Sequence, residues 1–167
     1  MDLDFVTLKP FDKNIFWNFV PEEDDGYLTG SSFHFHNGHA IIKKMLNYLA
    51  TSYHPNEWTY SGPAMIKHAV LKFCRKTSPK PTYPMADLCP GVRVLSRRFL
   101  YPYKYEQWRH FFRNKSSPND KAFKSHAVHF YNKLSKRNPI FVGSNQIYSL
   151  IARNHCPVSY GQAIDFF

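Results

Sequence analysis

The strongest structural signal in the sequence is an amphipathic pattern that begins after Asn37. Asparagine favours a helix start because its side chain can accept a free backbone N–H. The apolar residues that follow share one helical face: Ile41, Ile42, Met45, Leu46 and Leu49. A second pattern of this kind opens at Gly62-Pro63 and predicts a buried stripe of Met65, Ile66, Ala69, Val70 and Phe73. Two amphipathic helices are therefore expected.

Short strand patterns alternate with these helices. The first ten residues read as the end of a strand followed by a turn, and further strands are expected at 27–35, 92–95 and 127–131. Two more helices are expected at 105–112 and 144–153, the latter with Ile147, Leu150 and Ile151 facing inward. Strands and helices in mixed order favour an α/β fold over an all-α or all-β fold.

Composition narrows the class of protein. The 167 residues suit one domain, and a hydrophobic fraction of 43% with 20% charged residues predicts a packed core rather than disorder. No stretch approaches the roughly 20 consecutive apolar residues of a membrane span. The net charge of +10 favours an anionic partner. Nucleic acid is the least favoured such partner, because the basic residues are scattered in pairs and no nucleic-acid-binding motif is present.

The three cysteines, Cys74, Cys89 and Cys156, are too few for a disulfide scaffold and lack the spacing of a metal site. One disulfide with one remaining thiol is possible, so the cysteines alone leave the redox compartment open. A GxSxG elbow, a Walker loop and a dinucleotide fingerprint are all absent from the sequence, which removes several common enzyme classes.

The sequence Asp2-Leu3-Asp4 is a candidate metal site. Alternating carboxylates beside a strand offer hard oxygen ligands to Mg²⁺ or Mn²⁺. The alternative is a solvated acidic chain end. His129 could add an imidazole to the same cation, with Lys133 beyond it to meet phosphate oxygens; the alternative for His129 is a structural role.

His34, His36 and His39 form a second group of possible metal ligands. His34 and His36 would share one face of a strand. No carboxylate or cysteine follows at a recognisable zinc interval, which favours an aromatic-rich surface strand instead.

Several of these segments, in this order, resemble one known family. The matching runs are DLDFVTLKPF, YLTGSSFHF, W-x-x-x-GP at Trp58, FCRK, CPGVRVL, FLYPYKYEQWRHFF, HAVHFYNK and RNHCPVSYGQAI. They resemble the alpha-1,4-glycosyltransferases related to lactosylceramide 4-alpha-galactosyltransferase (globotriaosylceramide synthase), which are similar to glycosyltransferase family 32. The resemblance covers nearly the whole chain.

This resemblance implies a hexosyltransferase of the Golgi membrane, on its lumenal side, with a GT-A type (Rossmann-like) fold made of a mixed sheet and flanking helices. Such enzymes transfer galactose or N-acetylgalactosamine from UDP-galactose or UDP-N-acetylgalactosamine to a glycosphingolipid in retained alpha-1,4 linkage. On this chain, Asp2, Asp4 and His129 would hold Mn²⁺, with Lys133 near the phosphates. The resemblance names no catalytic residue.

The segment Tyr60-Ser61-Gly62-Pro63 would border the donor sugar, because a helix N-terminus presents free N–H groups. A plain helix start is the alternative. The lumenal location implied by the family would also allow Cys74 and Cys89 to form a disulfide around the proline-rich segment Thr77 to Pro84. Thr29 and Ser61 depart from residues common in the family, which would weaken contacts to the sugars.

Only Met1 precedes the Asp-x-Asp sequence. We therefore expect residues 1–167 to be a C-terminal region whose nucleotide-binding half, stem and membrane anchor lie upstream, and which has weak activity or none alone. The alternative is a non-catalytic module, derived from such an enzyme, that binds a glycan or another protein.

Overall fold

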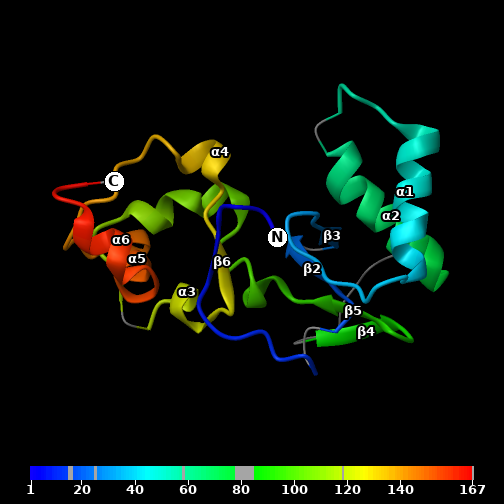
Figure 1. Cartoon of the computed structure of the whole chain (residues 1–167), viewed down its shortest axis with the longest axis horizontal. Helices are drawn as coiled ribbons and strands as arrows, with labels where there is room; N and C mark the ends of the chain where they lie inside the picture. The colour runs from blue at the N-terminus through cyan, green and yellow to red at the C-terminus, as the bar shows by residue number, and fades with distance from the viewer. Residues whose placement is uncertain (15–16, 25, 58, 78–84, 118, 167) are drawn as a thin grey trace. The chain divides into compact units, whose positions relative to one another are not determined.

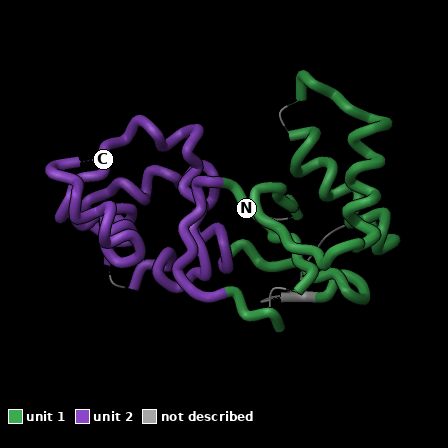
Figure 2. Tube along the Cα trace, in the orientation of Figure 1, with its two compact units in different colours: residues 1–2, 11–97 green, residues 3–10, 98–167 purple. Residues whose placement is uncertain are grey.

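The computed structural model describes residues 1–14, 17–24, 26–57, 59–77, 85–117 and 119–166. The chain divides into two compact units (Figures 1 and 2). The first unit holds residues 1–2 and 11–97, and the second holds residues 3–10 and 98–167. Trp58 and most of the proline-rich segment, which the sequence analysis singled out, lie outside the described residues.

The first unit contains a four-stranded mixed sheet in the order β3-β2-β5-β4. Its strands are β2 (Phe19–Asp24), β3 (Tyr27–Leu28), β4 (Met85–Cys89) and β5 (Val92–Leu95). β2 and β5 run parallel, whereas the two outer strands pair antiparallel with their neighbours. The expected mixed α/β class and the strand at 92–95 are confirmed.

Two helices, α1 (Ala40–Ser52) and α2 (Met65–Cys74), pack side by side in the first unit (Figure 1). A π-helical turn, Tyr60–Ala64, leads into α2. The inward residues of both helices meet residues of the sheet in one core: Val20, Leu28, Ile41, Met45, Ile66, Ala69, Val70, Val92 and Val94. Both predicted amphipathic helices are therefore present.

Two details of the first helix differ from expectation. The N-cap is His39 rather than Asn37, and its side chain accepts a hydrogen bond from the Ile41 N–H. Leu46 is 63% exposed because it lies beside the helical stripe defined by Ile41 and Met45, which are the buried residues of α1. The helix buries a narrower face than the run of apolar residues predicts.

The strand expected over 27–35 ends at Leu28. Beyond it, the hydroxyl oxygen of Thr29 accepts the Ser31 N–H at 3.2 Å and lies 2.9 Å from the Ser31 hydroxyl. Such local side-chain hydrogen bonds compete with the ladder of a sheet, so a turn replaces the strand. Gly30 then passes close to the backbone of Gly62, which a Cβ atom on Gly30 would meet at 3.2 Å.

The second unit is built from short elements. Strand β1 (Phe5–Thr7) pairs antiparallel with β6 (Ala127–His129), and Figure 1 shows this blue N-terminal strand beside β6. The helices are a 3₁₀ helix (Tyr105–Phe112), α3 (Lys121–Lys124), α4 (Asn132–Ser135), α5 (Ile147–His155) and α6 (Pro157–Gln162). Aromatic rings fill much of the core, with Tyr101, Phe111 and Phe130 buried.

The second unit differs from expectation at several element ends. The N-terminal strand, expected within the first ten residues, covers Phe5–Thr7 and follows the Asp-x-Asp sequence. β6 stops at His129 because the backbone of Tyr131 turns into the left-handed region, with φ of 52°. The last predicted helix begins at Ile147, with Gln146 as N-cap, and Leu150 is only half-buried. A separate helix, α6, starts with Pro157, where the missing N–H costs nothing.

Among the residues that the structure describes, no helix is long and apolar enough to cross a bilayer.

Candidate metal centre

Pairing of β1 with β6 brings Asp4 and His129 together although 125 positions separate them in the sequence. In the antiparallel register, Phe5 lies opposite His129. One residue before Phe5, the Asp4 carbonyl accepts the Phe130 N–H at 3.0 Å, which extends the pairing past the strand ends. The backbone thus holds the residue that precedes one strand beside the end of the other.

The carboxylate of Asp4 is held by both of its oxygens. Oδ1 lies 3.1 Å from His129 Nε2, and Oδ2 accepts the backbone N–H of Asn132 at 2.7 Å. Burial raises the pKa of Asp4, but the hydrogen bonds from His129 and Asn132 and the imidazole charge outweigh that effect. The pKa of Asp4 therefore lies below its ordinary value, and the group is a carboxylate at neutral pH.

Aromatic rings fix the orientation of His129. Phe5 stacks on the imidazole with centroids 4.6 Å apart, and the edges of Tyr101 and Tyr131 approach at 5.6 and 4.5 Å. This packing leaves Nε2 directed at Asp4. The opposite nitrogen, Nδ1, is buried and has no hydrogen-bond partner among the described residues.

Asp2 completes a possible ligand set. One ligand atom each from Asp2, Asp4 and His129 lies within 4.8 Å of the others, and these three are the single such group of histidine, cysteine, aspartate and glutamate found in the described parts of the chain. Two carboxylates and one imidazole are a donor set that suits Mn²⁺ or Mg²⁺. The carboxylates fit a hard divalent cation.

His129 fits that cation less well than the carboxylates do. A cation on Nε2 would leave the ring proton on Nδ1. This atom is the buried nitrogen without a described partner, whereas a metal-ligating histidine usually donates its second N–H to an acceptor. His129 is therefore the weakest of the three expected ligands.

The expected donor-binding residues fall into both units. Lys133 is exposed in the first turn of α4, four residues after His129. Tyr60, Ser61 and Gly62 belong to the π-helical turn of the first unit. The N–H groups of Tyr60 and Gly62 donate to the carbonyls of Glu57 and Thr59, at 3.0 and 3.4 Å. The free N–H groups that motivated this assignment are thus already used at these two positions.

The three cysteines and the histidines of the 34–39 segment lie outside the metal group. Cys74, at the end of α2, forms a disulfide with Cys89 of β4, with Cα atoms 5.4 Å apart, while Cys156 is free and exposed. His39 caps α1, and His36 accepts an edge-on contact from His39 at 4.8 Å. Within this cluster, His39 therefore serves as a helix cap and packs against His36.

Two structural contributions to the site were not predicted from the sequence. The first is the backbone N–H of Asn132, since a main-chain donor is independent of the side chain that marks a position. The second is Tyr131, whose left-handed backbone directs the chain from β6 into α4 and whose hydroxyl donates to the Tyr103 carbonyl at 2.9 Å. A bulky residue with positive φ is unusual and marks a constrained position.

A family model and the curated relatives of this chain all indicate the same family of glycosyltransferases. Residues 34–163 match the model described as the alpha 1,4-glycosyltransferase conserved region. The chain is 23% identical over 167 residues to a human alpha-1,4-N-acetylglucosaminyltransferase, which covers 98% of this chain and 47% of that protein. It is 24% identical over 163 residues to a rat lactosylceramide 4-alpha-galactosyltransferase, which covers 96% of this chain and 43% of that protein.

The chain thus spans about half the length of these curated relatives. No solved structure matches it. The family model covers most of the chain, including β6 with His129. The chain belongs to the alpha-1,4-glycosyltransferase family.

Proposed function

We propose that this chain is the part of an alpha-1,4-glycosyltransferase that binds the diphosphate of a UDP-sugar through a divalent cation, with Mn²⁺ as the cofactor. The observation that carries the proposal is the Asp4 carboxylate, anchored between His129 Nε2 and the Asn132 N–H. Asp2 and Asp4 would hold the cation, with His129 as a third ligand. When bound, the cation would act as a Lewis acid that offsets negative charge on the departing UDP.

The residues around Asp4 prepare it for this role. Its carboxylate keeps a fixed orientation and stays ionised, because the hydrogen bonds and the nearby imidazole outweigh the effect of burial on its pKa. Lys133 lies where α4 begins, four residues after His129, and would contact phosphate oxygens of the donor. Lys133 follows directly on Asn132, whose backbone N–H holds the Asp4 carboxylate, so the same short region after β6 would couple binding of the cation to binding of the phosphates.

The donor and the acceptor are proposed by class. The names of the relatives include a galactosyltransferase and an N-acetylglucosaminyltransferase, so the proposed donors are UDP-hexoses and UDP-N-acetylhexosamines, among them UDP-galactose and UDP-N-acetylgalactosamine. We propose a glycosphingolipid acceptor, retention of the anomeric configuration, and a parent enzyme at the lumenal side of the Golgi membrane. The lactosylceramide in the name of one relative supports a lipid-linked acceptor.

Calorimetric titration with Mn²⁺ and UDP tests this proposal on the complete 167-residue chain. We expect saturable UDP binding that requires Mn²⁺. Asp4→Asn should weaken Mn²⁺ binding by about 100-fold, since it removes a charged ligand. The matched control is Asp165→Asn. Asp165 is an exposed aspartate of the second unit that lies outside the metal group.

Equal Mn²⁺ affinity in the wild type and Asp4→Asn would exclude this carboxylate as a ligand. Folded protein that binds neither Mn²⁺ nor UDP would favour the second candidate, a non-catalytic module. Manganese electron paramagnetic resonance gives an independent readout, because the signal of the free ion decreases on binding whether or not the chain is active.

A further inference from the structure

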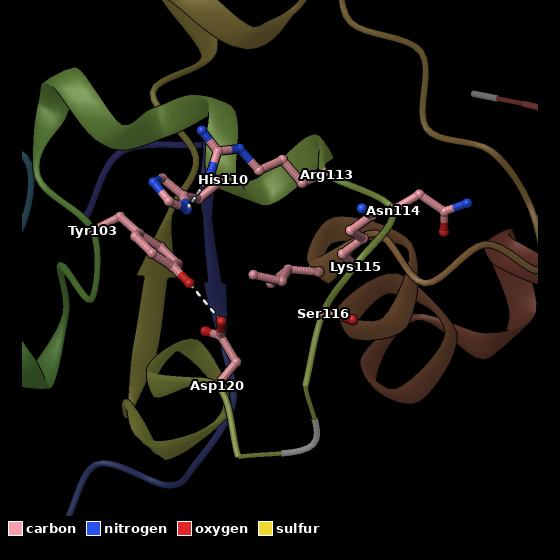
Figure 3. Close-up of a pocket in the computed structure, with 8 residues that line it drawn as sticks. Tyr103, His110, Arg113, Asn114, Lys115, Ser116 and Asp120 are labelled. Carbon is pink, nitrogen blue, oxygen red and sulfur yellow. Dashed lines mark hydrogen bonds between the residues drawn. The ribbon is translucent and has the colours of Figure 1, made fainter.

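A cavity of about 570 Å³ lies in the second unit, apart from the residues of the metal group. Its walls come from the end of the 3₁₀ helix, the segment that follows it, and the start of α5 (Figure 3). This volume is within the range of small-molecule sites, roughly 300–1,000 Å³. The proposed function makes no use of the cavity.

The cavity carries an excess of positive charge. Arg113 and Lys115 both line it and are exposed, and within the residues that the structure describes neither forms an ion pair. Figure 3 shows Arg113 extending toward His110, and Nη1 of Arg113 lies 3.4 Å from His110 Nδ1. Burial and the charges of Arg113 and Lys121 lower the pKa of His110, which indicates that the positive field reaches into the wall.

The one acidic residue of the lining, Asp120, has other partners. Its Oδ2 accepts the Tyr103 hydroxyl at 2.6 Å (Figure 3). Its Oδ1 accepts the Ala122 N–H at 2.9 Å, as the N-cap of α3. Both oxygens are thus committed to structural hydrogen bonds. Asp120 therefore offsets the charge of the two cations without pairing with either of them.

Neutral polar groups and one apolar side chain complete the lining. Asn114 Oδ1 accepts the Asn145 N–H at 2.7 Å, and the amide NH₂ of Asn114 keeps the capacity to donate. The hydroxyl of Ser116 donates to the Asn145 carbonyl, so its oxygen keeps the capacity to accept. Ile147 adds an apolar surface. Cations, neutral donors and acceptors, and an apolar patch together match the groups of a charged sugar.

We propose that this cavity binds a saccharide that carries an anionic group, a sulfate, phosphate or carboxylate. Arg113 and Lys115 bind the oxyanion, Arg113 through the planar fork that suits such groups. Asn114 and Ser116 bind hydroxyl groups, and Ile147 contacts the C–H face of the ring. The site is separate from the metal group and does not depend on the proposed transferase activity.

Titration with glucose 6-sulfate tests this proposal, with glucose and inorganic sulfate as matched probes. The titration uses the complete chain with a metal chelator present. We expect glucose 6-sulfate to bind at least about tenfold more tightly than either probe, since charge-assisted hydrogen bonds and hydroxyl contacts add. Arg113→Gln and Lys115→Gln should each weaken binding by about tenfold.

Arg153→Gln is the control, because Arg153 is an exposed arginine of the same unit outside the cavity and the change in net charge is identical. Equal binding of glucose and glucose 6-sulfate would overturn the role of the cations. Inorganic sulfate that binds as tightly as glucose 6-sulfate would overturn the assignment to a saccharide. Asp4→Asn should leave this binding unchanged, so a failure of the metal proposal remains distinguishable from a failure here.

Discussion

The two units stabilise their cores by different means. In the first unit, two helices of 13 and 10 residues pack with a mixed sheet, and a disulfide joins α2 to β4. In the second unit, strands β1 and β6 have three residues each, and contacts between rings fill the core. Long regular elements bury apolar stripes in the first unit, whereas large aromatic side chains pack against one another around the short elements of the second.

This difference explains where the candidate metal centre lies. Asp4 and His129 are held at the ends of two short strands, where the chain leaves the ladder and side chains can converge on one point. Packing of His129 against Phe5 and Tyr131 replaces the support that a longer strand would give. A rigid base with irregular ends is the usual setting for binding residues.

Removal of an aromatic ring from the second core should have the largest effect on stability. Phe111 is fully buried, with ring centroids 4.8 Å from Phe130 and 5.1 Å from Tyr103. We expect Phe111→Ala to lower the free energy of unfolding by about 3–5 kcal/mol, because it removes buried apolar surface and leaves a cavity. Urea denaturation measures this change. Phe141→Ala is the control, since Phe141 is 50% exposed.

Hydrogen exchange tests whether the two units unfold separately. We expect faster exchange in Phe111→Ala for amides of 98–167, with amides of 11–97 less affected. Equal acceleration throughout the chain would show that the two units unfold together, and would contradict the view that each has a core of its own.

Loss of the disulfide should have the next largest effect, and in the first unit. Cys74 and Cys89 close a loop with a sequence separation of 15. Their replacement by serine should cost about 3 kcal/mol, because the unfolded chain gains the entropy that the link removed. Thermal unfolding measures the cost, and Cys156→Ser, which alters a free exposed thiol, is the control. If the variant that lacks both Cys74 and Cys89 were as stable as the wild type, the disulfide would not contribute to the stability of the first unit.

The smallest expected effect is a pH dependence that involves His39. Burial and the charge of His36 lower its pKa, and its Nδ1 must be unprotonated to cap α1. The folded state therefore disfavours protonation of His39, so this contribution to stability is fully present above the ordinary pKa of 6.5 and is lost as the pH falls below it.

His39→Asn should keep the cap and weaken this pH dependence, because asparagine is a good N-cap and does not titrate. Chemical denaturation at a series of pH values measures the slope. His110 and His126 also have pKa values lowered chiefly by burial, so part of the slope should remain in the variant. An unchanged slope in His39→Asn would contradict the role of this cap.

The sequence predicted the helical faces better than it predicted element ends. Met65, Ile66, Ala69 and Val70 are buried as their spacing indicates, because a period of three to four residues defines one face of a helix. The prediction of a strand over 27–35 was wrong because Thr29 and Ser31 form local hydrogen bonds. An alternation of apolar and polar residues does not reveal such bonds. The prediction that the strand continues to residue 131 was wrong, because the residues around Tyr131 do not reveal that its backbone is left-handed.

The sequence by itself determined the family, the mixed α/β class and the identity of the metal-ligand candidates, since these depend on residue types and their order. Only the tertiary structure decided that His129 lies beside Asp4, that Asn132 N–H holds the second carboxylate oxygen, and that Arg113 and Lys115 share a cavity. The physical reason is that these contacts join distant residues through strand pairing, tertiary packing and backbone groups. The local spacing of residues predicts neither a long-range strand register nor a main-chain hydrogen bond.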